Sequence, residues 1–365
     1  MSTTSTTSAQ PDLLYSEAED DLRAAVRSLL AGRSDTAALL ARAETGRPYD
    51  AGLWTSLAAG IGAAGLLVPE KLGGQGATHR EAAVVLEELG RAVTPAPYLT
   101  SSVIATGTLL ALGGEAPEEL LRDMAAGRTI AVLALPLTAA AVGEEFPEGP
   151  VRAVADAAVA DVLLVPRPDG LYAVRREDAT LAPQTPLDLT RPLATVTVEG
   201  APATRLADAA ATRTAVQRGL LAGAGLLASE QLGVAEWCLE ETVRYTRERH
   251  QFNRPVGSFQ ALKHRMAQLW LEVVGARAAA RNAADALATG SDEAALAVSV
   301  AQAHCSRVAT RAAEECVQLH AGIGMTWEHP AHLYLKRAKS DELALGSPGH
   351  HKGVLAELVA LPAPR

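Results

Sequence analysis

Aromatic side chains are scarce in this sequence, at 4% of 365 residues, and no uncharged apolar run approaches the ~20 residues that a membrane-spanning helix needs. The basic residues are scattered and the net charge is −9, which argues against nucleic acid or an anionic membrane surface as a partner. The first residues, MSTTSTTSAQPDLL, lack a basic segment followed by an apolar core. We therefore expect a cytoplasmic protein.

Cysteine is also rare. Its three copies, Cys238, Cys305 and Cys316, are far apart and lie on helical patterns. None belongs to a CxxC pair or stands at metal-ligand spacing from a histidine. We therefore expect thiols of the core rather than metal ligands, and the sequence predicts no metal site.

Aliphatic residues, in contrast, are abundant. Hydrophobic residues make up 48% of the chain, led by Ala and Leu, as is typical of helix-rich proteins. The length favours two or three cores that share interfaces. We expect a disordered tail at residues 1–11, a helical region at 12–128, a β domain at 129–207 and a helical bundle at 208–365.

Hydrophobic periodicity marks the expected helices on both sides of the β domain. In the N-terminal region the apolar residues recur at helical spacing in 16–31, 50–65, 79–92 and 115–126. The four longer C-terminal helices are suited to an antiparallel bundle. The helices expected in that region are 209–248, 258–289, 292–320, 330–343 and 350–360.

The middle of the chain changes period. Its short runs are β-branched or alternating and are separated by Pro and Gly, which predicts the strands of a small sheet or barrel. These runs are TIAVLAL, VADAAVA, DVLLVPR, LYAVRR and ATVTVEG. The predicted fold class is thus mainly α with a central β domain.

Local signals predict several helix ends. Thr78 followed by Glu81 has the spacing of a capping box at the start of a helix. Gly90 is suited to a left-handed C-cap at the end of the same helix. Ser258 is a suitable N-cap for the second helix of the bundle.

The polar stretch RERHQFNRPVGSFQ, residues 247–260, interrupts two long helical patterns. It brings together a guanidinium, two amides and an aromatic ring, a set suited to a phosphate and the edge of a heterocycle. These side chains belong to Arg249, Gln251, Phe252 and Gln260. The alternative interpretation is a solvated turn between packed helices.

Three stretches together with the domain order resemble the acyl-CoA dehydrogenase family of flavoenzymes. They are LLVPEKLGGQG at 66–76, VLEELGRA at 85–92 and VQLHAGIGMTWEHPAHLYLKRA at 317–338. The resemblance covers nearly the whole chain. It implies a helical N-terminal domain, a middle β domain and a C-terminal four-helix bundle, assembled into dimers or tetramers. It also implies FAD as cofactor and α,β-dehydrogenation of an acyl-CoA thioester.

The resemblance gives the 247–260 corner a role. In the family, the corner between the first two bundle helices reaches across the dimer and holds the pyrophosphate and adenosine half of the neighbour's FAD. The matching positions in this sequence are Arg249, Gln251, Phe252 and Gln260, completed by Gln318 and Gly322. A planar cation suits a diphosphate, and a glycine lets backbone amides approach it closely.

The sequence departs from the family in two places. Where the family has a loop that hydrogen-bonds the flavin ring, this chain reads LALPLTAAAVGEE at 133–145. Where the family has the glutamate that removes the α-proton, this chain has Leu345 before Gly346, and at the alternative position it has Gln217 beside Arg218. Neither leucine nor glutamine can accept that proton.

Two carboxylates, Asp341 and Glu342, stand about one helix turn from the position of the missing base. Both are expected on an exposed helix end, and no residue of this chain is predicted to be catalytic.

A chain with the FAD-tail contacts but without the ring contacts and the base resembles one subunit of the actinobacterial α2β2 acyl-CoA dehydrogenases, several of which act on CoA esters of steroid side chains. We therefore expect a second acyl-CoA dehydrogenase-like subunit as partner and an acyl-CoA as substrate. One alternative is a homodimeric flavoenzyme that uses Asp341 or Glu342 in a remodelled site. Another is a non-catalytic scaffold with the same fold.

Overall fold

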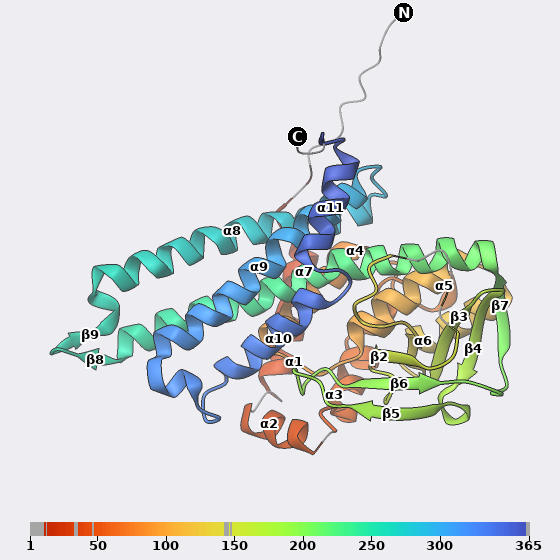
Figure 1. The fold of residues 1–365 in the computed structure, drawn as a ribbon, viewed down its shortest axis with the longest axis horizontal. Coiled ribbons are helices and arrows are strands. Elements are labelled where there is room, and N and C mark those ends of the chain that lie inside the picture. Colours follow the sequence, from red (N-terminus) through yellow and green to blue (C-terminus); the bar gives the residue numbers. More distant parts are fainter. Residues whose placement is uncertain are drawn as a thin grey trace, which may run out of the picture.

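The computed structural model describes residues 11, 13–32, 36–45, 47–141, 146 and 148–362. The tail predicted at residues 1–11 lies outside this part of the chain, apart from its last residue. Helices precede and follow a small group of strands, so the predicted fold class, mainly α with a central β region, is confirmed (Figure 1).

The N-terminal helices pack around the first part of the core. They are α1 (Glu17–Ala31), α2 (Thr36–Glu44), α3 (Ala51–Thr55), α4 (His79–Arg91), α5 (Thr106–Leu112) and α6 (Glu115–Ala125). The helix expected over 50–65 is interrupted, because Gly62 takes a left-handed φ of 81° after the π-helical turn η1 (Ser56–Gly60). A buried π-helical segment that the sequence analysis missed, η4 (Tyr98–Ala105), leads into α5.

The strands form two small sheets. One has the order β1-β3-β4-β7 and the other β2-β6-β5, with β1 and β3 parallel and the other pairs antiparallel. The strands are β1 (Ala131–Leu133), β2 (Val151–Ala155), β3 (Val162–Arg167), β4 (Gly170–Arg175), β5 (Thr180–Gln184), β6 (Leu193–Thr197) and β7 (Thr204–Asp208). The strand predicted from VADAAVA is wrong beyond Ala155, because Asp156 turns the chain with a φ of 60°.

The C-terminal helices form the bundle. They are α7 (Ala209–Glu248), α8 (Gln260–Ala288), α9 (Ala294–His320), α10 (Ala331–Leu343) and α11 (Pro348–Leu358). Helix α7 starts beside β7 and runs the length of the molecule to a hairpin formed by β8 (His250–Gln251) and β9 (Arg254–Pro255) (Figure 1). The helix boundaries predicted for this region lie within two residues of those observed.

The predicted helix ends have different outcomes. The capping box of α4 is confirmed, because the Thr78 N–H donates to Glu81 at 2.8 Å and the Thr78 hydroxyl accepts from the Arg80 N–H at 3.1 Å. The N-cap predicted at Ser258 is wrong. This residue ends a short 3₁₀ turn, and α8 begins two residues later without a side-chain cap.

Gly90 is not a C-cap, because α4 continues through it to Arg91. Its small size serves packing instead. A Cβ on Gly90 would lie 2.1 Å from the carbonyl oxygen of Glu230 in α7, and one on Gly233 would lie 1.9 Å from that of Glu87 in α4. The two glycines therefore let the backbones of α4 and α7 cross in direct contact.

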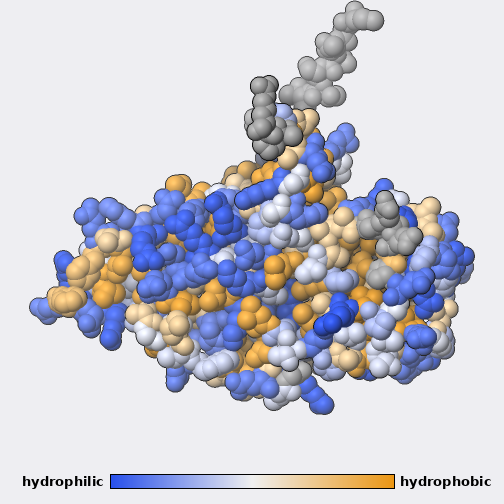
Figure 2. Space-filling model, in the orientation of Figure 1, coloured by the Kyte–Doolittle hydropathy of each residue, from blue (hydrophilic) through white to orange (hydrophobic). Residues whose placement is uncertain are grey.

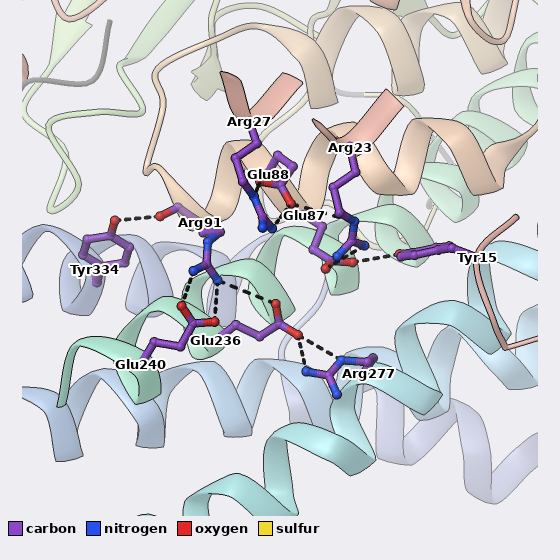
Figure 3. Close-up of polar contacts among 10 residues, drawn as sticks. All are labelled: Tyr15, Arg23, Arg27, Glu87, Glu88, Arg91, Glu236, Glu240, Arg277 and Tyr334. Carbon is purple, nitrogen blue, oxygen red and sulfur yellow. Dashed lines mark hydrogen bonds and ion pairs between the residues drawn. The ribbon is translucent and has the colours of Figure 1, made fainter. Parts of the chain in front are cut away.

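Ion pairs extend this crossing to α1 and α8 (Figure 3). From α1, Arg23 contacts Glu87 at 3.0 Å and Arg27 holds Glu88 with two bonds of 2.8 and 2.6 Å. Both glutamate side chains are buried, so their charges are satisfied by these arginines rather than by water. From α8, Arg277 holds Glu236 of α7 with bonds of 3.0 and 2.6 Å.

Gly233→Ala is expected to lower the free energy of unfolding by about 1–3 kcal/mol, the usual cost of overpacking a close contact. The matched control is Gly353→Ala on α11, where an added Cβ meets nothing within 4 Å. Alanine should stabilise that exposed helix by ~0.5–1 kcal/mol. Chemical denaturation measures both, and equal stabilities of the two variants would contradict the close crossing.

Candidate functional site

Leu345 occupies the position at which the family resemblance places the glutamate base. It lies two residues after the end of α10, and its side chain is only 2% exposed. Its backbone has a φ of 52°, a left-handed conformation that costs a leucine ~1–3 kcal/mol. Two hydrogen bonds hold it there: its N–H donates to the Leu137 carbonyl at 2.8 Å, and the His351 ring donates to its carbonyl at 3.0 Å.

Leu137 belongs to the stretch that stands in place of the family's flavin-ring loop, so the two departures meet in space. Between them lies a cavity of about 30 Å³. That is room for a water molecule or two, whereas pockets for small ligands are usually ~300–1,000 Å³. Aliphatic side chains make most of its wall, which consists of Thr100, Ile104, Val132, Leu133, Leu135, Pro136, Leu137, Ala155, Leu220 and Leu345.

The nearby carboxylates do not face this cavity. Asp341 was expected on an exposed helix end, and this expectation is wrong, because its side chain is completely buried. Glu342 is half-buried and contacts Lys339 at 3.4 Å. At the alternative base position, Gln217 and Arg218 are both exposed on the first half of α7.

Asp341 belongs instead to a buried group of charges that we name the Arg337 cluster. Its members are Asp188, Arg191, Glu230, Arg337 and Asp341. The Arg337 guanidinium donates to Asp188 at 2.5 Å and to Glu230 at 2.5 Å, and also to the Thr190 hydroxyl at 2.7 Å. The cluster therefore joins α10, α7 and the loop between β5 and β6.

The carboxylates of the cluster have opposite pKa shifts. Burial favours the neutral acid at Asp188, but Arg337 and the Thr190 hydrogen bonds outweigh it and hold the pKa of this carboxyl below its usual range. At Asp341, burial and the nearby Glu230 raise the pKa well above its usual range, although Arg191 lies 3.5 Å away. The contacts with Arg337 and Thr190 therefore favour the ionised form of Asp188, whereas burial favours the protonated form of Asp341.

The predicted FAD-tail residues lie at the other end of α7. Gln251 ends β8, and the next two residues, Phe252 and Asn253, have φ values of 53° and 59°, which form the tight turn of the hairpin. The end of α9 lies beside the end of α7, because the His320 ring stacks on Tyr245 with 4.3 Å between centroids. All six predicted residues are exposed: Arg249, Gln251, Phe252, Gln260, Gln318 and Gly322.

Two glycines after α9 differ in what they do for this chain. A Cβ on Gly324 would lie 2.5 Å from the Val317 carbonyl oxygen, so packing within the chain requires a glycine there. A Cβ on Gly322 would meet no described atom within 4 Å. Gly322 therefore leaves open surface that a ligand or a partner can approach closely.

Large apolar side chains are exposed at this same end of the bundle. Phe252 is 86% exposed, Met325 78% and Trp327 56%. Apolar residues are visible on this end of the surface, where Figure 1 places β8 and β9 (Figure 2). Such exposed apolar groups, rimmed by polar residues, are typical of a surface that contacts a partner.

The sequence analysis missed the Arg337 cluster. Arg337 lies in a stretch that carries the family resemblance, but the spacing of the sequence gives no sign that Asp188, Glu230 and Arg337 meet. The prediction of core thiols is confirmed, since all three cysteines are free and buried.

Comparison with known proteins gives the family of the chain. The model of the acyl-CoA dehydrogenase N-terminal domain matches residues 16–128, and that of the C-terminal domain matches residues 213–360. Acyl-CoA dehydrogenase IpdE2 of Mycolicibacterium smegmatis is 37% identical over 333 residues, which cover 91% of this chain and 96% of the relative. The chain therefore belongs to the acyl-CoA dehydrogenase family.

Solved structures of the family have the same fold. The ChsE4–ChsE5 complex from Mycobacterium tuberculosis matches with a TM-score of 0.84 and 26% identity, over 97% of this chain and all of the other. A variant of the Tcur3481–Tcur3483 steroid acyl-CoA dehydrogenase matches with a TM-score of 0.83 and 26% identity, over 94% of this chain and 98% of the other. No helix among the described residues is long and apolar enough to cross a membrane.

Two asparagine variants test the assignment of charge in the Arg337 cluster. Asp188→Asn is expected to lower the free energy of unfolding at pH 7 by about 3–5 kcal/mol, because it deprives the buried guanidinium of Arg337 of one of its two carboxylate partners. Asp341→Asn is expected to be tolerated. The folded-state pKa of Asp341 exceeds the unfolded value, so the wild type loses stability as the pH rises through the folded pKa, and asparagine removes that loss.

Denaturant unfolding at pH 6, 7 and 8 measures both variants. The stability of Asp341→Asn relative to the wild type should increase across this series. A destabilisation by Asp341→Asn as large as that by Asp188→Asn would mean that Asp341 is ionised.

Proposed function

We propose that this chain is the base-less subunit of a heteromeric, FAD-dependent acyl-CoA dehydrogenase. In the proposed complex, this chain contacts the diphosphate and adenosine half of FAD, and a partner subunit contacts the flavin ring and carries the glutamate base. The observation that carries the proposal is the meeting of Leu345 and Leu137, joined by a 2.8 Å backbone hydrogen bond where the family places its base and its flavin loop.

The residues of this chain fit one half of FAD and not the other. A cavity of about 30 Å³ with aliphatic walls has no room for a flavin ring and offers it few hydrogen-bonding side chains. At the hairpin end, the exposed Arg249 guanidinium can bind a diphosphate, and Gly322 leaves backbone open to close approach. The exposed side chains of Gln251, Gln260 and Gln318 can hydrogen-bond the adenosine half.

The proposed roles of the two subunits follow from these positions. FAD supplies the acceptor for the β-hydride, and a glutamate of the partner takes the α-proton. This chain binds and orients the FAD tail through Arg249, and the apolar ring of Phe252 covers it from water. Nothing in the described part of this chain places an ionised carboxylate at the cavity beside Leu345, since Asp341 is buried in the Arg337 cluster.

The comparisons support a heteromer and a steroid-derived substrate. Two similar structures bear names of paired chains, ChsE4–ChsE5 and Tcur3481–Tcur3483, and the second is named a steroid enzyme. We infer an α2β2 assembly that dehydrogenates the CoA thioester of a steroid side chain. The burial of Asp341 disfavours its use as the base of the homodimeric alternative, whereas a complex that purifies without flavin would favour the non-catalytic scaffold.

Arg249→Ala in the complex with the partner tests the tail contact. Loss of a charge-assisted bond of about 1.5–3 kcal/mol should weaken FAD binding by about 10- to 150-fold. The control is Arg247→Ala, which removes an exposed arginine two residues away on the last turn of α7. The measurement is FAD affinity of the co-expressed, deflavinated complex, and equal affinities of the two variants would show that this corner is only a turn.

A further inference from the structure

Two imidazoles and a carboxylate meet near the hairpin end of the bundle. Glu241 comes from α7, His320 is the last residue of α9, and His329 lies just before α10. One donor atom of each lies within 4.8 Å of the other two. The sequence predicted no metal site because these ligands come from three separate segments.

The geometry of His320 prepares one ring nitrogen for a ligand. The His320 side chain is completely buried, and its Nδ1 lies 2.6 Å from the Cys316 carbonyl oxygen. A carbonyl can only accept, so Nδ1 carries a proton, and in the neutral ring Nε2 keeps its lone pair. Among the described residues, Nε2 has no hydrogen-bond partner, although it lies 3.8 Å from the Glu241 carboxylate.

This arrangement is the one that metal-binding histidines usually adopt, with the second ring nitrogen donating to a backbone carbonyl or a carboxylate. The spacing also fits. Two ligands at about 2.0–2.1 Å from a tetrahedral ion stand about 3.3 Å apart. Here Glu241 Oε1 lies 3.5 Å from His329 Nε2 and 3.8 Å from His320 Nε2, and no two of the three donor atoms are more than 4.8 Å apart, so closure onto an ion requires the two rings to move closer together.

We propose that Glu241, His320 and His329 bind one divalent transition-metal ion of the Zn²⁺ class. The two imidazole nitrogens suit Zn²⁺ better than Mg²⁺ or Ca²⁺, which prefer oxygen ligands, and Zn²⁺ also accepts a carboxylate oxygen. With three protein ligands, the fourth position falls to water. The ion connects the end of α7, the end of α9 and the start of α10, and so holds the segment that carries Gly322 against α7.

Metal binding changes two contacts. In the structure, Arg244 holds Glu241 through both carboxylate oxygens, and the distance from its Nε to Oε2 is 2.8 Å. Arg244 is exposed and also contacts Glu248 at 2.8 Å, so it can release one oxygen and keep an ion pair. At His329, coordination through Nε2 moves the ring proton to Nδ1, and the 3.2 Å hydrogen bond from the Ala331 N–H is given up.

The test titrates the purified full-length protein, with its partner subunit present, with Zn²⁺ and with Co²⁺ as a visible probe after treatment with a chelator. We expect one tightly bound ion for each copy of this chain, and tetrahedral Co²⁺ absorption. Glu241→Gln and His329→Gln should each weaken binding by more than the ~10–100-fold that loss of a second-shell partner costs. Arg244→Gln should strengthen it, since it removes the competing cation.

His332→Gln is the matched control, because this neighbouring histidine lies outside the group of three ligands. Circular dichroism of each variant establishes that it is folded, so lost binding is not lost structure. Absence of an ion at one per chain would overturn the proposal. So would equal affinity in the wild type, Glu241→Gln and His329→Gln, which would mark adventitious surface binding.

Discussion

A buried guanidinium sets the arrangement of this molecule. Arg337 on α10 lies between Asp188 of the β5–β6 loop and Glu230 of α7, with 2.5 Å to each. An ion pair that is removed from water is stable only where the hydrogen-bonding geometry between the two charged groups is good. The β region, the long helix of the bundle and the helix that ends before Leu345 are therefore fixed relative to one another.

The position of Leu345 follows from that attachment. It lies eight positions after Arg337 in the sequence, and the backbone hydrogen bond from its N–H to Leu137 completes the link to the β region. A glutamate in the same place would be surrounded by the aliphatic wall of a cavity of about 30 Å³. The opposite end of α7 is built differently, with exposed polar groups, an exposed Phe252 and the open surface at Gly322. One end is closed and apolar, and the other faces outward.

Local periodicity made most of the helices predictable, because the apolar residues that each helix buries recur at helical spacing. Helix α7 begins and ends at the predicted residues, and the Thr78 capping box is present. Gly90 was misassigned because a glycine near a helix end has the same signature whether it terminates the helix or lets a neighbouring backbone approach. Its contact with Glu230 is 140 residues away in sequence and leaves no local sign.

The candidate site was likewise only partly predictable from the sequence. The lack of a proton acceptor at position 345 could be predicted, because a leucine has none wherever it is placed. The burial of Asp341 could not be predicted, because it depends on Arg191, Glu230 and Arg337, which meet around it only in the folded chain. Asp341 lies in a closed interior in the structure, whereas Glu342 at the same helix end is only half-buried.

The most direct test of the proposal that this chain supplies only the FAD-tail half of the site is to count the flavins that substrate can reduce. Anaerobic titration with an acyl-CoA substrate would be carried out on the co-expressed complex, on this chain alone and on a complex that contains Leu345→Glu. The account predicts one reducible flavin for each pair of unlike chains, no increase with Leu345→Glu, and none in this chain alone. One substrate-reducible flavin per copy of this chain, purified without a partner, would contradict it.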